Sequence, residues 1–330
     1  MNKQKLVSIV VPMYNESEMC DIFFETVNKY LNDITTSKKH IAFEIIAVND
    51  GSIDDTLKKL YKQNEKADNV TVLSLSRNFG QEPAVFAGLE KAKGDAIIVM
   101  DCDLQDPPEL ISQMVDKWEE GYNVVNARRV TRKSDTKFKR DTAGVYYNIL
   151  NKLSNKVKFP HNVNNFRLIS RKVLDIILAM PEKNKFYRGL VPFTGFKSAE
   201  IDIERKKRHS GTSKYNFKSM LKLAADGITA TSVKPLLWAF GFGVAFIILG
   251  ILGAIALIIL SLYNISLNYT LTGLISAMSF FSGIILMFAG ITGLYIGKCY
   301  EEIKGRPFNI IDLYIPSKND KQKNSDSDKI

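Results

Sequence analysis

The stretch Ala96-Ile97-Ile98-Val99-Met100-Asp101-Cys102-Asp103-Leu104-Gln105-Asp106-Pro107-Pro108 decides the fold class of this chain. Its first five residues are apolar, which predicts a buried parallel strand. Asp101 and Asp103 follow at once, and open α/β sheets bind their ligands outside the carboxyl ends of such strands. Carboxylate oxygens suit Mg²⁺ or Mn²⁺, which typically hold a diphosphate. The alternative is a polar turn whose acids cap a helix that begins near Pro107 or Pro108.

Other apolar runs of strand length alternate with helical patterns along the first two thirds of the chain. This alternation predicts an α/β fold with a doubly wound, mostly parallel sheet for residues 1–213, although it does not set the strand order. We expect Gly94 to close the third helix. The expected strands are 6–11, 43–48, 70–75, 96–100 and 122–126, and the expected helices lie near 16–32, 53–65, 81–93 and 108–119.

Polar residues gather where the expected strands end. The segments 12–16, 49–56 and 76–82 follow the first three strands, so they share one edge of the sheet with Asp101 and Asp103. A lone Asn-Asp-Gly-Ser is normally a turn and a helix cap, but four polar loops at one edge indicate a binding site. The chain has neither Gly-x-Gly-x-x-Gly nor Gly-x-x-x-x-Gly-Lys, which disfavours dinucleotide and P-loop sites.

A long uncharged span lies near the end of the chain. From Pro235 to Gly297 there is no Asp, Glu, Lys or Arg. The two apolar runs 236–262 and 271–297 each exceed the roughly 20 residues that a helix needs to cross a bilayer. We therefore expect a transmembrane hairpin over 235–298. Basic residues flank it on both sides, which predicts cytoplasmic termini and a cytoplasmic segment 299–330 with a disordered tail from Ser317.

The overall charge and the cysteines narrow the class of protein. The formal net charge of +10 can indicate nucleic acid, but no nucleic-acid motif is present. Binding of phosphate groups beside an anionic membrane surface explains the excess of positive charge better than nucleic-acid binding does. The three cysteines have no metal-like spacing, which predicts a reduced compartment without a disulfide framework.

Two basic segments predict contact with a lipid phosphate. Seven Lys and Arg residues lie within 128–140, and arginine suits bidentate recognition of phosphate, so Arg128 and Arg140 are the candidates. A second basic element, 205–218, leads into the segment 214–234, which we expect to lie as an amphipathic helix in the membrane interface. The alternatives are a solvated charged face and a helix that packs on the core.

Several elements, taken in order, resemble glycosyltransferase family 2: Val-Pro-x-Tyr-Asn-Glu at 11–16, Val-Asn-Asp-Gly-Ser at 48–52, Ser-Arg-Asn-Phe-Gly at 76–80 and the run 94–109. Within that family the chain is similar to the polyprenyl-phosphate sugar transferases, which include bactoprenol glucosyltransferases and dolichyl-phosphate mannose synthases. The resemblance continues through 165–168, 188–190 and 205–215 and covers nearly all of 6–312. It implies a GT-A, Rossmann-like fold.

The resemblance also implies roles for individual residues. The nucleotide would be bound by Pro12, Tyr14, Glu16, Asp50 and Asp101. The metal, Mg²⁺ or Mn²⁺, would be held by Asp101, Asp103 and Gln105, and would neutralise the leaving nucleoside diphosphate. A solvated loop position is the alternative for Gln105. The expected catalytic residues are Asp103, Asn165, Arg205 and Arg208, and the acceptor phosphate is assigned to Arg128, Arg140 and Lys214.

One position departs from the family pattern. Asn165 stands where most relatives have an Asp that is proposed as the catalytic base. A neutral amide is no useful base near pH 7, so an alcohol acceptor would be poorly activated. A phosphate monoester, with a second pKa of about 6, is already mostly ionised. If the rate is limited by a base, Asn165→Asp should raise it by more than about tenfold; little change would support an ionised nucleophile.

These observations together predict a membrane enzyme of the bacterial plasma membrane, with its catalytic domain in the cytoplasm. It would transfer a hexose from a UDP-sugar to undecaprenyl phosphate with inversion, for use in cell-envelope glycans, and relatives suggest a homo-oligomer. One alternative is a processive polysaccharide synthase, although Trp118 and Trp238 are not in the Gln-x-x-Arg-Trp context of such enzymes. The other is a catalytically impaired nucleotide-sugar-binding membrane protein, motivated by Asn165.

Overall fold

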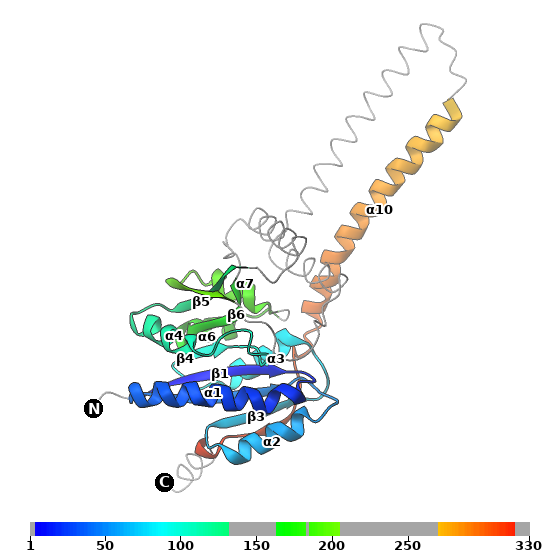
Figure 1. Ribbon diagram of the computed structural model, residues 1–330. Coiled ribbons are helices and arrows are strands. Elements are labelled where there is room, and N and C mark those ends of the chain that lie inside the picture. Colours follow the sequence, from blue (N-terminus) through cyan, green and yellow to red (C-terminus); the bar gives the residue numbers. More distant parts are fainter. Residues whose placement is uncertain (1–3, 132–162, 183–184, 205–269, 321–330) are drawn as a thin grey trace.

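The computed structural model describes residues 4–131, 163–182, 185–204 and 270–320 (Figure 1). Its strands are β1 (Lys5–Met13), β2 (Ile41–Asn49), β3 (Val70–Leu75), β4 (Ala96–Val99), β5 (Val124–Thr131), β6 (Val163–Ser170), β7 (Ser198–Glu204) and β8 (Ile311–Ile315). Its helices are α1 (Ser17–Ser37), α2 (Thr56–Lys66), α3 (Gln81–Lys91), α4 (Leu110–Glu119), α6 (Arg171–Ala179), α7 (Tyr187–Phe193) and α10 (Thr270–Ile303).

The strands form one sheet in the order β7-β5-β6-β4-β1-β2-β3-β8. The central strands β4, β1, β2 and β3 are parallel, as predicted. The sheet is mostly parallel, as predicted, but it is mixed because two strands are reversed: β6 runs antiparallel to both β4 and β5, and β8 runs antiparallel to β3. The reversal of β6 matters for the site, since it brings the start of β6 to the edge where β4 ends.

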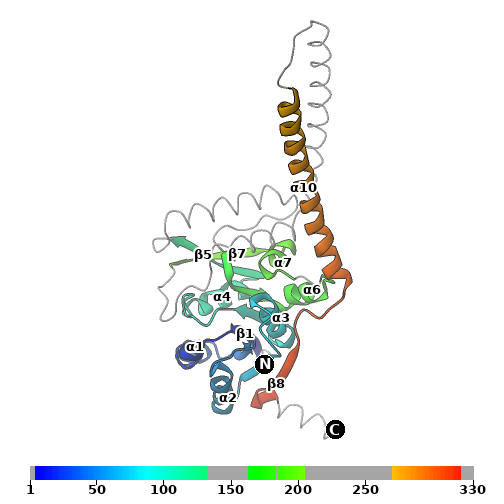
Figure 2. The ribbon, with the colours of Figure 1, turned by 90° about the vertical axis from the view of Figure 1, so that its right-hand side faces the viewer.

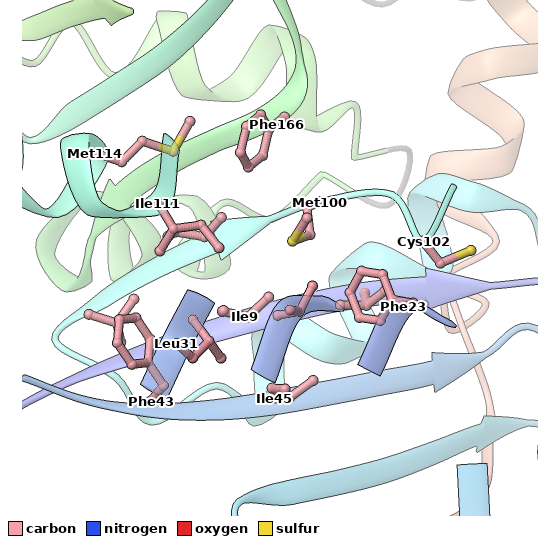
Figure 3. Packing of buried hydrophobic residues seen from close by; sticks show 14 of the residues in the cluster. Ile9, Phe23, Leu31, Phe43, Ile45, Met100, Cys102, Ile111, Met114 and Phe166 are labelled. Atoms are coloured by element: carbon pink, nitrogen blue, oxygen red, sulfur yellow. The ribbon is translucent and has the colours of Figure 1, made fainter. Parts of the chain in front are cut away.

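Helices cover both faces of the sheet, which makes the domain doubly wound (Figure 2). One core cluster joins α1, α2 and α4 to one face, and the other joins α3, α6 and α7 to the opposite face. Alternation along β1 explains this division, because Ile9 belongs to the first cluster and Val10 to the second. Figure 3 shows the first cluster, in which Phe23 and Leu31 of α1 pack near Ile9 and Ile45.

Helix α3 lies close against the sheet because it carries a glycine at the contact. A Cβ added at Gly88 would lie 2.4 Å from Val10 Cγ1 and 3.0 Å from Val48 Cγ2. The prediction that Gly94 closes this helix is wrong, since the helix ends at Lys91 with Ala92 as its C-cap. Gly94 instead lets the chain approach β1, because an added Cβ there would lie 2.6 Å from the Ser8 nitrogen.

The chain returns to the sheet after its long apolar helix. Strand β8, from the predicted C-terminal segment, pairs with β3 and completes the sheet edge. The prediction of disorder from Ser317 is wrong for 317–320. Ser317 is buried, its N–H donates to Thr71 Oγ1 at 3.2 Å, and Asp320 forms an ion pair with Lys93 at 2.7 Å. Residues 321–330 lie outside the described residues.

Helix α10 extends away from the sheet domain (Figure 1). It contains the second predicted apolar run, 271–297. Its segment Phe281–Tyr300 has a mean hydropathy of 1.5 and no residue of it is buried inside the protein. Within the described residues this is the one helix that is long and apolar enough to cross a membrane. The first apolar run, 236–262, and the amphipathic segment 214–234 lie outside the described residues, so the hairpin stays a prediction.

Candidate active site

The two carboxylates of the quoted stretch lie at the carboxyl end of β4, where both are part-buried. Gln81 Nε2, at the start of α3, donates to Asp101 Oδ1 at 2.8 Å. Asp103 Oδ1 accepts the backbone N–H of Gln105 at 3.1 Å. Leu104, between Asp103 and Gln105, has a φ of 53°, a backbone conformation that is strained for a residue with a Cβ. The turn after β4 is therefore held in an unusual shape that keeps these oxygens at the sheet edge.

The loops after β1 and β2 bind each other through polar contacts. The backbone N–H of Asn15 donates to Ser52 Oγ, and the N–H of Ile53 donates to Asn15 Oδ1, both at 2.9 Å. Glu16 lies near Cys102, the residue between Asp101 and Asp103. Burial raises the pKa of the Cys102 thiol well above its usual range, and the charges of Glu16, Asp101 and Asp103 raise this pKa further. Glu16 of the first loop therefore lies close to the residues that follow β4.

Asp50 fastens the loop between β3 and α3. Its two carboxylate oxygens accept the backbone N–H groups of Phe79 at 2.8 Å and Gly80 at 2.9 Å. The residue is buried, and this burial raises its pKa, while the two N–H donors oppose the rise. Asp50 therefore shapes the loop that leads into Gln81, whatever contact it also makes with a nucleotide.

Asn165 lies at the start of β6, across from the end of β4. The pairs Val99–Arg167 and Ile98–Leu168 set an antiparallel register that, extended by two residues, puts Asn165 opposite Asp101. Asn165 is 1% exposed, and its Oδ1 accepts a hydrogen bond from Arg188 Nε at 2.8 Å. Its Nδ2 is buried and has no partner among the described residues.

Behind Asn165 and Asp101 lies a group of buried and part-buried polar side chains, which includes Glu82, Arg167 and Arg188. Glu82 Oε2 accepts the backbone N–H of Tyr187 at 2.8 Å, which ties the start of α7 to the start of α3. Burial raises the pKa of Glu82, and the charges of Arg188 and Arg167 oppose the rise. The Arg167 guanidinium lies 5.4 Å from the centre of the Tyr187 ring. No spacing rule connects positions 82, 167 and 188, so the sequence signals were the polar segment 76–82 and the resemblance at 165–168 and 188–190.

Arg128, a predicted phosphate ligand, has acidic partners in the structure. On β5, it forms ion pairs at 2.7 Å with both Glu200 and Asp202 of the neighbouring β7. Any phosphate at Arg128 must therefore compete with these carboxylates. The predicted residues Arg140, Arg205, Arg208 and Lys214 lie outside the described residues.

The residues at the β4 edge fit a hard divalent cation. Gln105 is buried rather than a solvated loop residue, and its Oε1 has no hydrogen-bond partner among the described residues. Two carboxylates and an amide oxygen are ligands that Mg²⁺ and Mn²⁺ accept. Within the described part of the chain, no group of three or more His, Cys, Asp or Glu side chains could hold a metal. Substrate oxygens or water would have to complete the coordination shell.

Residues 8–178 match the family described as Glycosyl transferase family 2. The chain belongs to this family. The enzyme is therefore a glycosyltransferase with a GT-A-like fold, as the resemblance of its sequence elements had implied. The free thiols of Cys20, Cys102 and Cys299 also agree with the predicted lack of disulfides.

Full-length relatives support the same assignment for this family 2 glycosyltransferase. An uncharacterized glycosyltransferase of Bacillus subtilis (strain 168), YkcC, is 40% identical over 94% of each chain. The prophage bactoprenol glucosyl transferase homolog of Escherichia coli (strain K12) is 39% identical over 92% of this chain and 98% of its own. The bactoprenol glucosyl transferase of Shigella phage SfII is 38% identical over 92% and 97%.

Among solved structures, the mannosyltransferase PcManGT from Pyrobaculum calidifontis, in complex with GDP-Man and Mn²⁺, is similar at a TM-score of 0.42. It is 17% identical, and the match covers 78% of this chain and 81% of that one. A similarity this low carries no argument about the donor or the metal here.

Proposed function

We propose that this enzyme transfers a hexose from a UDP-sugar to undecaprenyl phosphate on the cytoplasmic face of the bacterial plasma membrane. The product is a polyprenyl-monophosphate sugar for modification of cell-envelope glycans. One observation carries the proposal: a paired-carboxylate edge and an exposed apolar helix occur in one chain whose relatives of similar length are named bactoprenol glucosyl transferases. The two carboxylates at the sheet edge suit a diphosphate donor, and the apolar helix suits a lipid acceptor.

The donor lies along the sheet edge in this proposal. The loops after β1 and β2, with Pro12, Tyr14, Glu16 and Asp50, hold the nucleotide. Asp101, Asp103 and Gln105 hold Mg²⁺ or Mn²⁺. When bound, the cation supplies charge neutralisation for the departing diphosphate.

The reaction is a single inverting displacement. An oxygen of the lipid phosphate forms a bond to the anomeric carbon of the sugar, while the bond from that carbon to the diphosphate oxygen breaks and UDP leaves with the electron pair. The acceptor phosphate has a second pKa of about 6, so it needs no base at neutral pH. The neutral side chain of Asn165 is compatible with this acceptor.

The membrane arrangement is part of the proposal. Helix α10 and the apolar run 236–262 cross the bilayer as a hairpin, with both termini in the cytoplasm. The return of the chain into β8 supports a catalytic domain close to the membrane, because six residues lie between Lys304 and Ile311. The basic segments 128–140 and 205–218 then face anionic lipid headgroups.

Membranes that contain the protein, incubated with labelled UDP-sugars and undecaprenyl phosphate, test the proposal. Transfer of label into a chloroform-soluble product that mild acid releases supports it. A water-soluble polymer would indicate a processive synthase instead. Metal-dependent binding of UDP-sugar without product would indicate the impaired protein that Asn165 also suggests. A panel of UDP-hexoses, scored by lipid product, identifies the sugar.

A further inference from the structure

Asn165 carries no charge among the ionisable side chains behind the β4 edge. The charges of Arg188, Arg167 and Asp101 act there on Glu82. Asn165 lies among them, almost fully buried, and contacts Arg188 directly. A carboxylate at this position would add a third negative charge to a poorly solvated cluster and would neutralise Arg188.

Asn165 has a buried donor that no described residue accepts. The amide oxygen of Asn165 is used by Arg188, and its buried Nδ2 has no partner among the described residues. A buried donor without a partner costs free energy, so a ligand oxygen that fills the position is favoured. Arg188 itself is part-exposed, so this side chain is not sealed in the core.

The position of the pair along the sheet indicates which phosphate group it meets. The loops assigned to the nucleotide follow β1 and β2, and the metal residues follow β4. Asn165 and Arg188 lie on the other side of β4, because the sheet order continues from β4 to β6. When the donor lies along this edge with its base at the loops after β1 and β2 and its diphosphate at β4, its sugar lies on the side of β6. The group that attacks the sugar therefore approaches from the β6 side.

We propose that Asn165 Nδ2 and the Arg188 guanidinium together bind the phosphate of the acceptor lipid. This inference rests on the proposed function and adds two residues to it. The amide nitrogen donates to a phosphate oxygen, and the guanidinium supplies charge that Asn165 orients without cancelling. The pair selects an acceptor that is already anionic.

The contact with Arg188 changes the outcome expected for Asn165→Asp. An aspartate would not act as a helpful base. It would form an ion pair with Arg188 and repel the phosphate, so kcat/KM for the lipid should fall by about 10- to 100-fold. Arg188→Gln should raise the KM for undecaprenyl phosphate by a similar factor, and Arg188→Lys by less, since it keeps the charge but loses the planar fork.

The experiment measures initial rates in detergent with both substrates varied, together with the affinity for UDP in the presence of Mn²⁺. Lys172→Gln is the matched control, because it removes an exposed cation at the opposite end of β6. We expect Arg188→Gln and Asn165→Asp to bind UDP within about twofold of the wild type while their KM for the lipid rises by about tenfold or more. Thermal melting shows whether each variant has folded, and Arg188→Lys is used if Arg188→Gln has not.

Two results would overturn the inference. If the wild type transfers sugar to the lipid and the Arg188 variants keep its lipid KM, or lose affinity for UDP instead, the pair does not bind the acceptor phosphate. If the wild type makes no lipid product, the proposed function fails, and this inference fails with it. The first result leaves the proposed function intact, so the two failures are distinguishable.

Discussion

Gly88→Ala should loosen α3 from the sheet and disturb the site that α3 supports. The added methyl group would lie 2.4 Å from Val10 Cγ1, well inside van der Waals contact. Val10 is fully buried and β-branched, so it has little freedom to move away. Overpacking of this kind costs about 1–3 kcal/mol, and the severe overlap favours the upper end. Replacing a helical Gly by Ala gains about 1 kcal/mol, so the net loss is about 2 kcal/mol.

Thermal melting of the purified protein in detergent measures this loss. A net change of about 2 kcal/mol corresponds to a Tm that is lower by about 4–8 °C for a domain of this size. Activity should also fall at a temperature where the variant is folded, because Gln81 and Glu82 at the start of α3 contact Asp101 and Tyr187. Displacement of a supporting element by about 1 Å can cost up to 100-fold in rate.

The double variant Gly88→Ala/Val10→Ala provides the internal control. Val10→Ala removes the methyl group that clashes, so the two changes should together cost about 1–2 kcal/mol less than the sum of the single changes. A Tm of Gly88→Ala equal to or above that of the wild type would refute the reasoning. Additive losses in the double variant would show that the contact with Val10 is not the cause.

Three further predictions follow from the site and the sheet edge. EDTA should abolish transfer and either Mg²⁺ or Mn²⁺ should restore it, whereas Asp103→Asn should stay at least about 100-fold less active at saturating metal; full activity after chelation would contradict the metal site. Burial raises the pKa of Glu82, so the folded state binds its proton more tightly than the unfolded state, and the stability that this group contributes is lost as pH rises. The difference in Tm between Glu82→Gln and the wild type should therefore be more positive at pH 7.5 than at pH 5. The same difference at both pH values would contradict the direction of the pKa shift. Truncation before Ile311 should expose the edge of β3, with a lower Tm and aggregation on size-exclusion chromatography; a monodisperse protein with unchanged Tm would show that β8 is dispensable.

Local pattern was enough for the central part of the fold. The strands β1, β2, β3 and β4 are continuous apolar runs because parallel strands are covered on both faces, and each was predicted within a few residues. The convergence of polar loops at one edge follows from that parallel order. Asp101 and Asp103 were predicted at this edge for the same reason, and the structure has them there.

The flanking strands β6, β7 and β8 were not predicted as strands, because their pairing is set by distant segments. Strand β8 has the short alternating sequence Ile-Asp-Leu-Tyr-Ile, and its partner β3 lies more than two hundred residues earlier. The alternation is a weak local signal for a strand, but it does not show which strand is its partner. The same reason explains why ordered residues at 317–320 were expected to be disordered.

The sequence by itself determined the family, the α/β class and the carboxylates at the end of β4, because these depend on short-range spacing and on hydrophobic periodicity. Tertiary structure alone decided that Asn165 lies across from Asp101 and accepts a hydrogen bond from Arg188. It also decided that Glu82 lies part-buried beside two arginines. Burial and charge balance are properties of neighbours in space, and positions 82, 165 and 188 become neighbours only when β6 reverses beside β4.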